Sequence, residues 1–95
     1  MLFTLTVKPN DKLEVWFIFV DGRPVTEWNR DLQTPLRLDA GKHRLTYQLH
    51  GKGGELEISL EPNAALTTPV EATWPYNATV PKNRAGTQNA IYFDV

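Results

Sequence analysis

The sequence predicts an all-β protein, a small antiparallel β-sandwich of seven or eight short strands. Over most of the chain apolar and polar residues alternate with a period of two rather than 3.6. Turn residues recur about every eight to twelve positions, a spacing typical of sandwiches. The 7 prolines are spread along the chain and would interrupt helices. Because 95 residues suffice for one hydrophobic core, we expect a single domain over residues 1–95.

Each expected strand is a short alternating segment that ends at a turn. Pro9-Asn10-Asp11-Lys12 closes the first strand, and Asp21-Gly22 closes the second. The stretch between Pro24 and Pro35 is ambiguous, with room for a short edge strand at 25–28. The expected strands are 2–8, 14–20, 36–39, 42–50, 55–61, 66–74, 76–80 and 89–95.

The clearest pair of strands is 42–50 and 55–61, which we expect to form a hairpin. The glycine-rich segment 51–54 joins them and can adopt positive φ angles. Burial of both apolar faces would set the register, because a slip of one residue exposes every apolar side chain. The expected opposite pairs are Leu49 with Leu56, Tyr47 with Ile58, Leu45 with Leu60, Gln48 with Glu57, and Arg44 with Glu61.

The number and spacing of the strands fit an Ig-like sandwich, although the Cys…Trp…Cys pattern of immunoglobulin domains is absent. Residues 17–60 resemble the PEGA-type surface-associated repeat, in which a VDG turn precedes a TP-led strand and a G-x-H turn opens the next. The resemblance implies a binding or spacer role and carries no catalytic residues. The separation of Val25 from Thr34 is longer than in that motif. The matching segments are Val20-Asp21-Gly22-Arg23-Pro24-Val25, Thr34-Pro35-Leu36-Arg37-Leu38 and Gly41-Lys42-His43-Arg44-Leu45, with Gly51 closing the strand.

Composition argues against several classes of partner and site. A net charge of −1 provides no basic surface for nucleic acid or anionic lipid. The absence of cysteine excludes disulfides, thiolate zinc sites and thiol catalysis. Residues 1–8 alternate and lack a positive n-region, so we expect neither a signal peptide nor membrane insertion. The expected lack of a signal peptide and the absence of cysteine favour a cytoplasmic location, and a cysteine-free domain is also compatible with export through a bacterial envelope.

No set of residues forms a recognisable catalytic or metal site. His43 and His50 fall on opposite faces of one strand, and neither has a carboxylate at ligand spacing in the sequence. Ser59 is the only serine and lies within a strand, without a nucleophile elbow. Glu55, Glu57 and Glu61 alternate along a face that we expect to be solvated, with Lys42 and Arg44 opposite. We therefore expect no enzyme, no cofactor and no bound metal.

Two binding hypotheses remain, with a small enzyme as a distant third. The strand 14–20 is apolar on both faces, and exposure of Trp16, Ile18 and Val20 would create a patch for a protein partner or for self-association. The alternative is a carbohydrate-binding module in which Trp28, Trp74 and Tyr76 stack on sugar rings. For that role, residues 29–31 beside Trp28 would supply hydrogen bonds.

Overall fold

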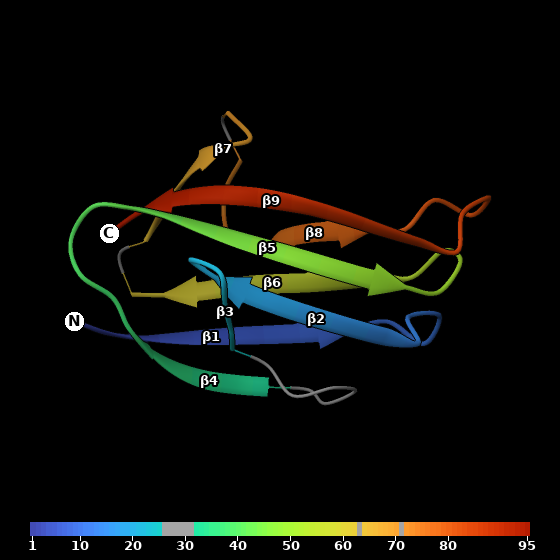
Figure 1. The fold of residues 1–95 in the computed structure, drawn as a ribbon, viewed down its shortest axis with the longest axis horizontal. Coiled ribbons are helices and arrows are strands. Elements are labelled where there is room, and N and C mark those ends of the chain that lie inside the picture. The colour runs from blue at the N-terminus through green and yellow to red at the C-terminus, as the bar shows by residue number, and fades with distance from the viewer. Residues whose placement is uncertain (26–31, 63, 71) are drawn as a thin grey trace.

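A computed structural model of the chain describes residues 1–25, 32–62, 64–70 and 72–95, and these contain strands and no helix. The strands form two antiparallel sheets that pack face to face (Figure 1). The predicted all-β sandwich is therefore confirmed. The strands are β1 (Leu2–Pro9), β2 (Val15–Val20), β3 (Arg23–Pro24), β4 (Leu32–Arg37), β5 (Lys42–His50), β6 (Glu55–Glu61), β7 (Ala65–Thr68), β8 (Tyr76–Thr79) and β9 (Gly86–Asp94).

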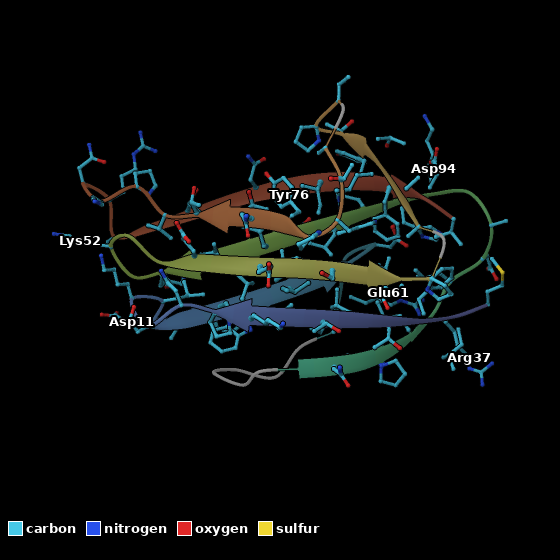
Figure 2. All side chains as sticks on the ribbon, turned by 180° about the vertical axis from the view of Figure 1, so that it is seen from behind. Asp11, Arg37, Lys52, Glu61, Tyr76 and Asp94 are labelled. Carbon is cyan, nitrogen blue, oxygen red and sulfur yellow. The ribbon has the colours of Figure 1, made fainter. Side chains whose placement is uncertain are left out.

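Except for β2 and β3, strands that are consecutive in the sequence lie in different sheets. The four-stranded sheet has the order β4-β1-β6-β8, and the five-stranded sheet has the order β3-β2-β5-β9-β7. The five-stranded sheet is nearer to the viewer in Figure 1, and the four-stranded sheet is nearer in Figure 2, which is seen from behind. β1 and β6 lie at the centre of one sheet, and β5 and β9 lie inside the other.

The core lies between the sheets and is built by the alternation in the sequence. The predicted inward residues of β1, Phe3, Leu5 and Val7, are all buried. Because each buried aliphatic or aromatic side chain contributes about 1.5–3 kcal/mol, the alternating strands supply most of the driving force for folding. The inward residues of the other long strands are Trp16, Ile18 and Val20 (β2), Leu45, Tyr47 and Leu49 (β5), Leu56, Ile58 and Leu60 (β6), and Ile91 and Phe93 (β9).

The expected hairpin of residues 42–61 is wrong, although both strand boundaries are correct. β5 pairs with β2 and β9, whereas β6 pairs with β1 and β8 in the other sheet. Gln48 therefore lies opposite Phe17 and Gln88 rather than Glu57, and Arg44 lies opposite Tyr92 rather than Glu61. The same alternation suits two strands side by side or two strands facing each other across a core, and here the segment 51–54 crosses between the sheets.

Three other strands differ from the prediction by more than one residue. β4 extends from Leu32 to Arg37 and includes Pro35, which an edge strand tolerates because its outer side needs no N–H donor. β7 ends at Thr68, directly before Pro69, and β9 begins three residues earlier than expected, at Gly86 opposite His50. The expected edge strand at 25–28 lies mostly outside the described residues.

The predicted Asp21-Gly22 turn is confirmed and joins β2 to β3. Val20 pairs with Arg23, which leaves a loop of two residues. Asp21 and Gly22 both have positive φ angles, 51° and 82°, as the type I′ hairpin turn requires. This turn places the Asp21 carboxylate beside the start of β5.

Candidate functional site

The structure buries the β2 residues that the assembly hypothesis placed on the surface. Trp16, Ile18 and Val20 keep only 4%, 1% and 5% of their surface exposed and belong to the core. They therefore do not form an exposed patch. The solvent-facing side of β2 carries Val15 and Phe17, followed by Phe19, and all three are half-buried.

The strands beside β2 extend this surface. Phe17 lies opposite Gln48 and Phe19 opposite Thr46, and Thr46 in turn lies opposite Ala90. In Figure 1 this side of the five-stranded sheet is turned toward the viewer, and no described element lies in front of it. We call this surface the outer face. It comprises Val15, Phe17 and Phe19 of β2, Thr46 and Gln48 of β5, and Ala90 and Tyr92 of β9. Tyr92 is 40% exposed.

The two described aromatic residues of the carbohydrate hypothesis, Trp74 and Tyr76, each pack against an aromatic ring of the core. The Trp74 ring packs edge-on against Phe93 with ring centroids 6.0 Å apart, and its Nε1 donates a hydrogen bond to the Ala64 carbonyl at 3.0 Å. Tyr76 is half-buried and lies against Tyr47, with ring centroids 6.3 Å apart. Trp28 and the adjacent residues 29–31 lie outside the described residues.

His43 has the carboxylate partner that sequence reasoning did not find. Its Nδ1 lies 2.6 Å from Oδ2 of Asp21, and its Nε2 lies 2.7 Å from the carbonyl oxygen of Asp39. The ring also stacks on Phe93, with centroids 5.5 Å apart. The signal was weak in the sequence because Asp21 is 22 residues away and the pairing of β2 with β5 brings it close.

These contacts shift both pKa values. The hydrogen bond to Asp21, and then the one to Asp39, raise the pKa of His43 above its ordinary value against a smaller effect of burial. Burial alone would raise the pKa of Asp21, but hydrogen bonds from His43 and from the Arg44 backbone N–H outweigh it, and the pKa is lowered. Each shift favours the charged form of its group, the imidazolium of His43 and the carboxylate of Asp21.

A hollow of about 310 Å³ lies at one side of the sandwich, between the β2–β3 turn and the end of β4. We call it the edge groove. Its apolar residues are Val20, Val25, Leu36 and Leu38, and its charged residues are Asp21, Arg23 and Arg37.

No group of three or more His, Cys, Asp or Glu side chains among the described residues is placed to hold a metal ion. Ser59 faces Thr6 across the outward side of the four-stranded sheet, and Glu57 lies between Lys8 and Asn77. Lys42 and Arg44 belong to the other sheet, so the expected pairing of the glutamates with them is wrong. None of the described segments forms a helix able to cross a membrane.

Comparisons with family models, with curated proteins and with solved structures found no significant match to this chain. The resemblance of residues 17–60 to the PEGA-type repeat therefore stays a prediction. The candidate surfaces are the outer face and the edge groove, and each is judged by its own geometry and chemistry.

Proposed function

We propose that this protein is a non-catalytic assembly module that binds a second copy of itself through the outer face. One observation carries the proposal: two phenylalanines and a valine project from the solvent side of β2, and no described element covers them (Figure 1). An antiparallel sheet with one solvated side usually carries polar residues there. Apolar residues in that position are typical of a surface that a partner covers.

The polarity of the surrounding residues supports a protein interface. Thr46 and Gln48, the direct cross-strand neighbours of Phe19 and Phe17, are uncharged. A partner could therefore cover Phe17 and Phe19 without removing a charge from water, which is costly when the charge is left unpaired. A contact that also covered Tyr92 would reach Arg44, which lies opposite it. The centres of protein interfaces are likewise poor in charged residues and rich in aromatic ones.

Symmetry and size support a second copy as the partner. Successive outward residues of a strand are about 6.8 Å apart, so Val15 and Phe19 are equidistant from Phe17. Consider a two-fold axis that lies between two facing copies, perpendicular to β2 and level with Phe17. It would bring Phe19 of each copy over Val15 of the other, which is the self-complementary contact of an isologous dimer. The molecule measures 38 × 27 Å across its broad side, about 1000 Å² in projection, and a standard interface covers about 800 Å² on each partner.

Carbohydrate binding through Trp28, Trp74 and Tyr76 stays a prediction, and no contact described above favours it. The two hypotheses differ in a simple experiment. A dimer whose tryptophan emission does not change with sugars agrees with the assembly proposal. A monomer whose emission shifts when a glycan from a panel is added would overturn it.

The molar mass in solution tests the proposal directly. We expect sedimentation equilibrium to give a dimer whose dissociation constant rises at least tenfold in the double variant Phe17→Thr/Phe19→Thr. Threonine keeps the β propensity of these positions, so the sheet should persist. The matched control is Leu2→Thr, which removes an exposed apolar side chain from the other sheet and should leave the dimer intact. A wild-type chain that is still monomeric at a concentration of about 1 mM would contradict the proposal. Its dissociation constant would then exceed about 1 mM, and the free energy of binding would be weaker than about 4 kcal/mol.

A further inference from the structure

The edge groove lies where the two sheets are open to each other. β3 is the edge of the five-stranded sheet and β4 is the edge of the four-stranded sheet, and the groove lies between these two strands and the segments that flank them. Figure 1 shows β3 descending from β2 toward the side of the molecule where β4 lies. The two edges belong to different sheets and are not hydrogen-bonded to each other.

The floor of the groove is apolar and continuous with the core. Val20 and Leu38 are buried, and Val25 and Leu36 are half-buried against the same core cluster. An apolar group that entered would contact these four side chains and leave water. The volume of about 310 Å³ is at the lower end of the range for small-ligand sites, and it suits one or two amino-acid side chains.

The rim of the groove has an excess of positive charge. Arg23 and Arg37 are both exposed, and within the described part of the chain no carboxylate pairs with either guanidinium. Figure 2 shows Arg37 at this margin of the molecule with its side chain in solvent. A free guanidinium presents a planar fork of donors that suits a carboxylate.

The third charge at the rim, Asp21, is already engaged. Its Oδ2 contacts His43, and its Oδ1 accepts a hydrogen bond from the Arg44 backbone N–H at 3.0 Å. These contacts turn the Asp21 carboxylate toward His43 and the start of β5. Of the charged residues that line the groove, the two arginines are the ones left to meet a ligand.

We propose that the edge groove binds a short peptide segment that carries an apolar side chain next to a carboxylate, such as a C-terminal leucine. The apolar side chain would lie on Val20, Val25, Leu36 and Leu38, and the carboxylate would pair with Arg23 and Arg37. This site is separate from the outer face, so it holds whether or not the protein forms a dimer. The open shape and the small volume favour an end of a peptide over a larger ligand.

The test uses two probes that differ only in charge, N-acetyl-alanyl-leucine and its C-terminal amide. We expect the carboxylate form to shift the methyl NMR signals of Val20, Val25, Leu36 and Leu38 in a saturable way. The amide should bind about three- to tenfold more weakly, since each exposed ion pair is worth about 0.2–1 kcal/mol. Equal binding of the two probes, or no shift at millimolar concentrations, would overturn the proposal.

Two variants and one further probe complete the experiment. Arg23→Gln/Arg37→Gln should weaken the carboxylate probe to the level of the amide, while Arg84→Gln, in the exposed segment that follows β8, should leave binding unchanged. Methyl spectra without probe confirm that each variant is folded. Octanoate supplies the same chemistry without a peptide. Binding of octanoate tenfold tighter than the peptide, with the same dependence on arginine, would reassign the site to free alkyl carboxylates and overturn the peptide proposal.

Discussion

The Nδ1 atom of His43 lies 2.6 Å from the Asp21 carboxylate, and its Nε2 atom lies 2.7 Å from the Asp39 carbonyl oxygen. Both partners accept hydrogen bonds and neither can donate one. A neutral imidazole has only one N–H, so it would satisfy one acceptor and turn a lone pair toward the other. The arrangement therefore favours the imidazolium form, which ties the turn after β2 to the segment before β5.

This arrangement makes the free energy of unfolding depend on pH. The stabilisation from His43 should be fully present below its ordinary pKa of 6.5 and should be lost as the pH rises through the raised pKa of the folded state. The contribution of Asp21 has the opposite sign: it is present above the ordinary value of 3.8 and lost as the pH falls through the lowered pKa. We expect urea midpoints to be highest between about pH 4 and pH 6.5, bracketed by the ordinary values of the two groups.

The matched control for this pH dependence is His43→Gln, whose amide N–H groups can donate hydrogen bonds but which does not titrate. Its urea midpoint should be lower than that of the wild type at pH 5.5 and should change less between pH 5.5 and pH 8.5. A variant with the same pH profile as the wild type would show that other groups cause the dependence.

Gly51 should tolerate alanine much less well than Gly41. Both have positive φ angles, 133° and 126°, so backbone strain is common to the two substitutions. A Cβ at Gly51 would press on the Lys12 carbonyl oxygen and lie 2.9 Å from the Glu14 nitrogen, whereas at Gly41 nothing lies within 4 Å. We expect Gly41→Ala to cost about 1–2 kcal/mol and Gly51→Ala about 2 kcal/mol more in urea unfolding. Equal losses would mean that the segment 51–54 can move away from Lys12.

Adjacent positions on β5 should respond differently to truncation. Leu49 is completely buried, so Leu49→Ala should lower the free energy of unfolding by about 2–5 kcal/mol through lost contacts and a cavity. Gln48 projects from the opposite side of the strand, and Gln48→Ala should cost about 0.5 kcal/mol or less. Urea unfolding of the two variants measures the contrast, and similar losses would contradict the assignment of inner and outer faces.

Engineered disulfides can test which strand lies beside β5. Gln48 and Gln88 are opposite each other on β5 and β9, where antiparallel Cα atoms are about 4.5–5.5 Å apart, within reach of a disulfide. Gln48→Cys/Gln88→Cys should therefore oxidise readily. The control Gln48→Cys/Glu57→Cys tests the hairpin that the sequence suggested, and it should stay reduced because β6 belongs to the other sheet. The chain has no cysteine of its own, so a thiol assay gives the result directly. Oxidation of the control pair alone would favour the hairpin.

Burial could be predicted from the sequence more completely than pairing. The inward positions of β1, such as Leu5, and of β6, such as Ile58, follow from alternation because a strand turns successive side chains to opposite sides. Which strand lies next to β5 depends on contacts between distant segments, and alternation does not record them. The same limit explains why Asp21 was not connected to His43, and why the surface of β2 was assigned to Trp16 rather than Phe17.

The last strand in the sequence has a consequence for how the protein folds. β9 lies between β5 and β7 inside the five-stranded sheet, and of the described pairings only β2 with β3 joins consecutive strands. A growing chain would therefore present β5 with one backbone edge unsatisfied until β9 has been synthesised. An unpaired strand edge of this kind is prone to aggregation, and sheets built from such distant pairings fold in about milliseconds to seconds.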